Sequence, residues 1–179
     1  MTGTFLYYAR AVDATMLLAL SAIASDQADP TTETMKKTLR FLDYVATHPD
    51  AILTFGKSSM ILNVHSDASY LCEPKAKSRA GGHFFLSDNA KDPRDNGAVL
   101  NIAKIMKNVM ASAAEAEIGA LFLNSRQAIP ARTTLIEMGH HQPPTPIQTD
   151  NTTALGFVGK NLTPKATKST DMQHWWMRD

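Results

Sequence analysis

The fold is decided by one stretch of the sequence, Met60-Ile61-Leu62-Asn63-Val64-His65-Ser66-Asp67-Ala68-Ser69. An apolar run that ends in an acid followed by small residues is typical of a buried strand that carries a carboxylate at its end. We therefore expect a strand that ends in Asp67. This aspartate is the first candidate functional residue of the chain.

Three further acids lie downstream, each at the edge of a separate expected element. Glu117 lies on a helix, Asp150 ends a second strand, and Asp171 lies in a terminal helix. Carboxylates are the hard oxygen ligands that Mg²⁺ prefers, and two such ions about 3.5–4 Å apart can stabilise both oxygens of a phosphoryl displacement. Without cations the four charges would repel one another, and some carboxyl pKa values would rise. The four acids are therefore candidate metal ligands if the fold brings them together.

Composition bounds the class of protein. The 179 residues are 44% hydrophobic and 20% charged, which suits one sizeable core with an attached subdomain. The formal net charge of +1 says little about partners, because proteins that bind nucleic acid mainly through phosphates are usually more basic. Cys72 is the single cysteine, which excludes an internal disulfide and a cysteine zinc site. With no long apolar stretch and no signal-peptide pattern, we expect a soluble intracellular protein that does not enter a membrane.

The first part of the chain has helical periodicity. Apolar residues repeat over residues 5–12, Asp13 is a candidate cap for a second helix, and Asp29-Pro30 for a third. The third helix is expected to bury one stripe of side chains, Met35, Leu39, Leu42 and Val45. We predict a three-helix subdomain over residues 1–50 and a second domain over residues 51–179.

In the second domain the periodicity becomes that of strands. Strands are expected over residues 52–55, 60–67, 81–86 and 98–106, the last three as an antiparallel meander. A helix over residues 111–122 and a further helical piece from Pro130 to Gly139 follow. The chain then continues with a short strand over residues 146–150, which the crossover makes parallel, and with helices over residues 151–158 and 167–179. This order predicts an α/β fold, a mixed sheet with helices packed on it.

Five segments in order carry a resemblance to a known family. They are residues 64–69, 78–86, 112–121, 149–154 and 167–172. Together they resemble the ribonuclease H domain of copia-type LTR retrotransposon reverse transcriptases, and residues 1–50 resemble the thumb and connection region that precedes it. The resemblance implies a ribonuclease H-like mixed five-stranded sheet with flanking helices. It also implies hydrolysis of the RNA strand of RNA–DNA hybrids with two Mg²⁺ ions, for which Mn²⁺ can substitute.

Carried over by motif, the metal ligands and catalytic residues are Asp67, Glu117, Asp150 and Asp171. Glu115 competes for the second place. We prefer Glu117, because the family's helix has an acid followed by an apolar residue, any residue and alanine. The resemblance further implies that the partners are an RNA–DNA hybrid and the polymerase domain of a parent polyprotein, in cytoplasmic virus-like particles.

The chain also departs from the family. Ser169 stands where the family segment has histidine, the last strand of cellular ribonucleases H has no counterpart between residues 158 and 171, and no Asp-Asp pair provides a polymerase site. The chain is therefore expected to be a fragment of a reverse transcriptase. The alternative is a catalytically silent domain of the same fold that binds nucleic acid or a polymerase partner, and a third is a protein-interaction scaffold.

Several residues have plainer interpretations. Asp67 alone is compatible with a turn acid, Asp150 with a helix cap, and His65 with a structural histidine. Trp175 and Trp176 are expected to cover apolar surface rather than stack on bases. The candidate phosphate contacts are Lys75, Lys77, Arg79 and the lysines at 160, 165 and 168. The plainer interpretation is that these basic residues form an ordinary solvated surface.

Overall fold

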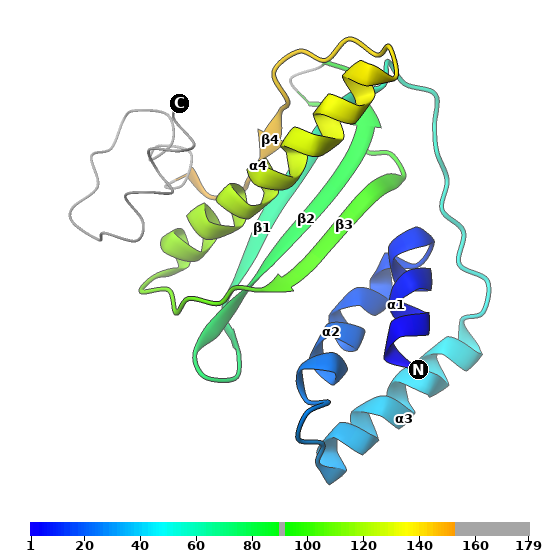
Figure 1. Cartoon of the computed structure of the whole chain (residues 1–179), viewed down its shortest axis with the longest axis vertical. Helices are drawn as coiled ribbons and strands as arrows, with labels where there is room; N and C mark the ends of the chain where they lie inside the picture. Colours follow the sequence, from blue (N-terminus) through cyan, green and yellow to red (C-terminus); the bar gives the residue numbers. More distant parts are fainter. Residues whose placement is uncertain (90–91, 153–179) are drawn as a thin grey trace. The chain divides into compact units, whose positions relative to one another are not determined.

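The computed structural model describes residues 1–89 and 92–152 (Figure 1). Several predicted features lie outside the described residues: Asp171, Ser169, both tryptophans and the expected helix over residues 167–179. Nearly all of the expected helix over residues 151–158 lies outside them as well. The chain divides into two compact units, of which the first is Met1–Thr54 and the second begins at Phe55. The boundary expected after residue 50 thus falls four residues later.

The first unit consists of α1 (Thr2–Ala11), the 3-10 turn η1 (Ala14–Met16), α2 (Leu17–Ser25) and α3 (Thr32–Thr47). Asp13 caps the 3-10 turn, since its carboxylate accepts a hydrogen bond from the Thr15 backbone N–H at 3.1 Å. The helical periodicity was interpreted correctly, but the unit is not three helices alone, because η1 precedes α2. Its buried hydrophobic residues are Ala9, Met16, Leu17, Leu20, Ile23 and Phe41.

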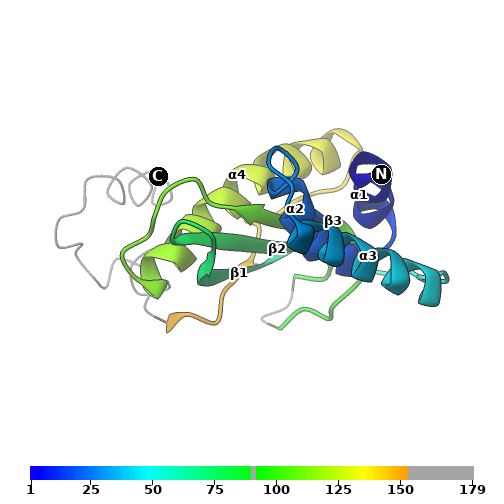
Figure 2. The same ribbon diagram turned by 90° about the horizontal axis from the view of Figure 1, so that it is seen from below.

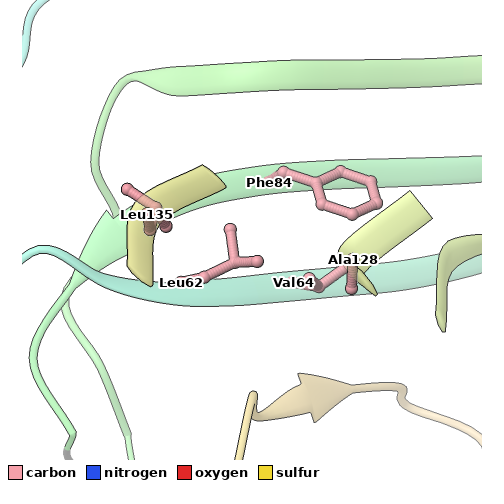
Figure 3. Packing of buried hydrophobic residues seen from close by; sticks show 5 residues of the cluster. All are labelled: Leu62, Val64, Phe84, Ala128 and Leu135. Atoms are coloured by element: carbon pink, nitrogen blue, oxygen red, sulfur yellow. The ribbon is translucent and has the colours of Figure 1, made fainter. Parts of the chain in front are cut away.

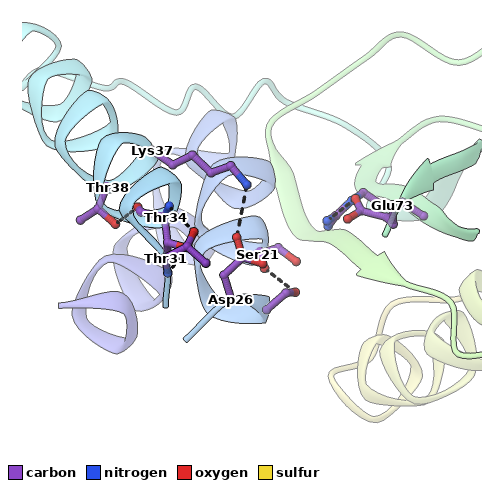
Figure 4. Close-up of polar contacts among 9 residues, drawn as sticks. Ser21, Asp26, Thr31, Thr34, Lys37, Thr38 and Glu73 are labelled. Atoms are coloured by element: carbon purple, nitrogen blue, oxygen red, sulfur yellow. Dashed lines mark hydrogen bonds and ion pairs between the residues drawn. The ribbon is translucent and has the colours of Figure 1, made fainter. Parts of the chain in front are cut away.

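The start and the buried face of α3 differ from expectation. Thr31, not Asp29-Pro30, is the cap: Thr31 and Thr34 exchange backbone-to-hydroxyl hydrogen bonds of 3.2 and 3.1 Å (Figure 4). Met35 and Leu39 are exposed, and Phe41 is buried instead. The reason is that the large ring of Phe41 packs edge to face on Phe5, with centroids 5.2 Å apart.

The second unit is built on a four-stranded sheet. Its strands are β1 (Ile61–Glu73), β2 (Lys77–Ser87), β3 (Ala98–Ile105) and β4 (Ile147–Gln148), in the order β3-β2-β1-β4. Strands β1 to β3 form the expected antiparallel meander, and β4 pairs parallel to β1 as the crossover predicted. The prediction of a mixed α/β sheet is confirmed. Five strands were expected, and the described residues form four.

Two strand predictions were wrong. Residues 52–55 form no strand, because no neighbouring strand pairs with them, and Ile52 is 86% exposed. Strand β1 does not end at Asp67 but continues to Glu73, because Asp67, Ala68 and Ser69 pair with Gly81, Ala80 and Arg79 of β2. The small residues after the aspartate are therefore part of a hairpin, and Asp67 lies within the strand.

Helix α4 (Ala113–Glu137) lies across one face of the sheet (Figures 1 and 2). Two helical pieces were expected, but Pro130 lies inside a single helix, at an exposed position. The helix ends where Gly139 adopts φ +91° and the N–H groups of Gly139 and His140 bond to the carbonyls of Ile136 and Leu135. None of the described helices is long and apolar enough to cross a membrane.

The core lies between α4 and the sheet. Alternate residues of β1 and β2 face the helix, and Leu62, Val64 and Phe84 pack against Ala128 and Leu135 (Figure 3). A buried amide completes this contact: the Asn124 side chain donates hydrogen bonds of 2.8 Å to both Ser66 Oγ and the Gly81 carbonyl. The helix is thereby fixed against β1 and β2 next to Asp67.

Gly82 allows this close approach. A Cβ atom added there would lie 2.3 Å from the Asn124 side-chain oxygen, whereas one at Gly81 would meet nothing closer than 3.6 Å. We expect Gly82→Ala to destabilise the protein by about 1–3 kcal/mol through overpacking, and Gly81→Ala, its matched control, to cost clearly less. Urea unfolding measures both. Equal costs for the two variants would contradict the proposed packing of Asn124.

Candidate metal centre

Three of the four predicted acids come together in the second unit. Asp67 lies within β1, Glu117 lies near the start of α4, and Asp150 follows β4. Each offers one carboxylate oxygen, and these oxygens all lie within 4.8 Å of one another. The acids are remote in sequence and belong to separate elements, so only the tertiary fold assembles them.

Strand pairing explains the position of Asp150. Val64 and His65 of β1 pair in parallel with Ile147 and Gln148 of β4. The same register, continued beyond the paired residues, brings Asp150 level with Asp67. Because parallel strands run in the same direction, both acids lie toward the same edge of the sheet.

The packing of α4 explains the position of Glu117. Ser112 caps the helix by accepting a hydrogen bond from the Glu115 N–H at 3.1 Å. Glu117 and Asn124 are seven residues, about two turns, apart and so lie on the same side of the helix. Since Asn124 is held on Ser66 and Gly81, Glu117 is directed at the neighbouring Asp67.

The structure also separates Glu117 from its competitor. The Glu115 carboxylate accepts a hydrogen bond of 2.6 Å from the Ala111 N–H, so it folds back on the start of its own helix. This is the role that an acid at this helical position commonly has. Glu117 belongs to the acidic cluster and Glu115 does not.

Glu117 is buried beside two like charges. Its side chain is 7% exposed, its Oε1 accepts a 3.3 Å hydrogen bond from the Ala68 N–H, and its Oε2 has no hydrogen-bond partner among the described residues. Burial, and then the charge of Asp67, raise the pKa of Glu117 to about 7, with a smaller contribution from Asp150 and against the lowering effect of the Ala68 hydrogen bond. A proton and a cation therefore compete for this carboxylate near neutral pH.

The three residues fit a hard divalent cation. They offer oxygen ligands only, they carry like charges that a cation would neutralise, and the unpartnered Glu117 Oε2 is buried. Asp171, the fourth predicted ligand, lies outside the described residues. The cluster could thus hold a metal ion.

Other candidate residues lie apart from the cluster. His65 packs edge to face on Phe85 with centroids 4.9 Å apart, and its Nε2 lies 3.7 Å from Asp95, which supports the structural interpretation. Arg79 is 5% exposed and pairs with Glu73 at 2.6 Å, so it does not project from the hairpin as a phosphate contact. Within the described part of the chain, His140 and His141 join no group of metal-ligand type.

The role of Asn124 was not predicted from the sequence. The one signal that could have indicated it is the Gly81-Gly82 pair, since glycine inside a strand often marks a close approach of another chain segment.

Comparison with known proteins adds no assignment. No protein-family model matches this chain, and neither the curated proteins nor the solved structures contain a match.

The raised pKa of Glu117 predicts a dependence of stability on pH. Between pH 4.5 and about 7 the unfolded chain loses the Glu117 proton while the folded chain keeps it, so the free energy of unfolding falls as pH rises. In metal-free buffer at pH 8 we expect Glu117→Gln to be more stable than the parent, on the order of 1 kcal/mol, and the difference to vanish near pH 4. Urea unfolding at both pH values checks this, with the exposed Glu137→Gln as control. A Glu117→Gln variant that is less stable at pH 8 would contradict the buried-charge interpretation.

Cation binding should reverse that destabilisation. At pH 8 and about a hundred times its dissociation constant, Mg²⁺ should stabilise the parent by about 2.7 kcal/mol, because it binds only the assembled cluster. Asp67→Asn and Asp150→Asn should each lose most of this effect, and Glu137→Gln should keep it. Thermal unfolding with increasing MgCl₂ measures the response, and equal responses in all four proteins would exclude the cluster as the site.

Proposed function

We propose that this chain is a metal-dependent endoribonuclease that hydrolyses the RNA strand of RNA–DNA hybrids, as the ribonuclease H part of a retrotransposon reverse transcriptase. One observation carries the proposal: Asp67, Glu117 and Asp150, chosen by motif order, have carboxylate oxygens within 4.8 Å of one another. Supporting it, the mixed sheet with α4 across one face is compatible with a ribonuclease H-like fold.

The electrostatics of the cluster favour phosphoryl chemistry with a cation. Three neighbouring carboxylates repel a phosphodiester on their own, so the substrate approaches only when their charge is neutralised. Asp67, Glu117 and Asp150 would hold Mg²⁺, with Asp171 as a proposed fourth ligand. When bound, a pair of such ions stabilises the attacking and the leaving oxygen of the phosphodiester. The expected products are a 5′-phosphate and a 3′-hydroxyl.

The residues around the cluster have supporting roles in this proposal. The Ala68 N–H orients one oxygen of Glu117 and leaves Oε2 for a ligand. Ser66 and Gly81 hold Asn124 and thus the register of α4 over β1. Because Glu117 keeps its proton below pH about 7, its ability to bind a cation should rise through that pH range.

Two observations favour a second candidate. The net charge of +1 is low for a protein that binds nucleic acid through phosphates, and Ser169 replaces the family histidine. The second candidate is a catalytically silent domain of this fold that binds nucleic acid or the polymerase domain of a parent polyprotein. It predicts hybrid binding or polymerase binding without cleavage.

Cleavage of a labelled RNA–DNA hybrid tests the proposal. We expect the chain with Mg²⁺ or Mn²⁺ to cut the RNA strand, and Asp67→Asn and Glu117→Gln to lose at least about a hundredfold in rate, because each removes a charged ligand. Glu115→Gln is the matched control, since glutamine can also accept the Ala111 hydrogen bond and should retain most activity.

Two outcomes would count against the proposal. A folded parent chain that leaves the hybrid intact at every Mg²⁺ and Mn²⁺ concentration favours the silent domain. Loss of activity in Glu115→Gln but not in Glu117→Gln would reassign the ligand.

A further inference from the structure

A groove of about 330 Å³ lies in the first unit, between α2 and α3. On the side of α2 and the 3-10 turn before it, the groove is lined by the apolar side chains of Met16, Ala19, Ala22 and Ile23. Phe41 supplies apolar surface from α3. Small-molecule sites in proteins have volumes of about 300–1,000 Å³. The groove is therefore large enough for a small organic ligand.

Two alanines leave the space between the helices unfilled. Ala19 and Ala22 are three residues apart, so they lie on the same side of α2, and both line the groove. Leu17 and Leu20, the large buried leucines of α2, do not line it. Because α2 presents only methyl groups at two neighbouring positions, α3 cannot close the gap by side-chain packing.

Polar contacts bound the groove at both ends. At one end the Lys37 ammonium pairs with the Asp26 carboxylate at 3.2 Å (Figure 4). At the other end the hydroxyl groups of Thr15 and Tyr44 are hydrogen-bonded at 3.0 Å. Lys37 and Tyr44 are seven residues apart on α3, which is about two turns, or roughly 10 Å. This length suits a small molecule rather than a segment of polypeptide.

The rim of the groove carries a positive charge that is not neutralised within the unit. Arg40 lies between Lys37 and Tyr44 along α3 and lines the groove. Lys37 is paired with Asp26, whereas Arg40 forms no ion pair among the described residues. The described lining includes no carboxylate. A guanidinium binds a carboxylate through two parallel hydrogen bonds, so Arg40 is complementary to a carboxylate on an otherwise apolar ligand.

We propose that the groove binds a small amphipathic carboxylate, with the carboxylate at Arg40 and the apolar body against Met16, Ala22 and Phe41. Burial of the apolar body supplies most of the affinity, and Arg40 selects an anion over a neutral or cationic analogue. The ligand contacts both α2 and α3, so its binding stabilises the first unit. The groove includes no residue of the acidic cluster, and the proposal does not depend on the nuclease activity.

Titration of the full chain with hexanoate, octanoate and decanoate tests the proposal. Backbone amide NMR gives both the Kd and the place of binding, in buffer without divalent cation or nucleic acid and below the micelle concentration of each probe. Each added pair of methylene groups should tighten the Kd about tenfold. The largest shifts should fall at Ala19, Ala22 and Arg40.

Substitutions separate recognition of the charge from recognition of the apolar body. Arg40→Gln should weaken octanoate binding about fivefold and leave octanol binding unchanged, and Arg40→Lys should retain most of the octanoate affinity. The matched control is Arg10→Gln, at an exposed position outside the groove. Ala22→Leu should fill the groove and abolish binding of both probes, whereas Ala24→Leu, exposed and outside the groove, should keep it. Circular dichroism confirms folding, and the exposed Arg40 provides a test that leaves the packing intact.

Three results would overturn the proposal. These are equal affinities for octanoate and octyltrimethylammonium, unchanged octanoate binding in a folded Ala22→Leu variant, and shifts confined to the second unit. The outcomes are distinct from those of the nuclease proposal, since cleavage is not measured. A chain that binds octanoate in the groove but cuts no hybrid leaves this site in place, and a chain that cuts the hybrid but binds none of the three carboxylates removes it.

Discussion

The buried amide of Asn124 is the interaction on which the site depends. Apolar packing of Leu62, Val64 and Phe84 against α4 gives the second unit its core, but such packing alone tolerates small rotations of a helix. The two hydrogen bonds from Asn124 to Ser66 and Gly81 do not, because a shift would leave buried polar groups without partners. They fix the helix where Glu117 meets Asp67.

The acidic cluster works against stability in the absence of a cation. The Glu117 side chain is 7% exposed, one of its oxygens has no partner among the described residues, and two acids lie beside it. Burial and the neighbouring charges disfavour its charged form and so raise its pKa. Such perturbed groups concentrate at functional sites. The hairpin contributes to this arrangement, since the Ala68 N–H that holds Glu117 belongs to the part of β1 that continues past Asp67.

Charge in the second unit is distributed unevenly. Acids gather where β1, β4 and the start of α4 meet, while Lys104, Lys107 and Arg126 gather on the other side of the same helix. Three acids and three cations together contribute no net charge, so the overall charge of +1 indicates neither set. A cation at the acids would meet a local field of the appropriate sign.

Local sequence patterns were sufficient to predict the order and type of most elements. Alternation and turn residues predicted the meander, the crossover predicted a parallel β4, and motif order selected Asp67, Glu117 and Asp150. Where the elements end, and which side chains meet, depends on contacts formed in the folded chain. Pairing with β2 extends β1 beyond Asp67, and Pro130 lies at an exposed position within a single helix. In α3, Phe41 is buried and Met35 is exposed. The convergence of the acids, the raised pKa of Glu117 and the groove between α2 and α3 likewise depend on contacts between residues remote in sequence, which local periodicity does not encode.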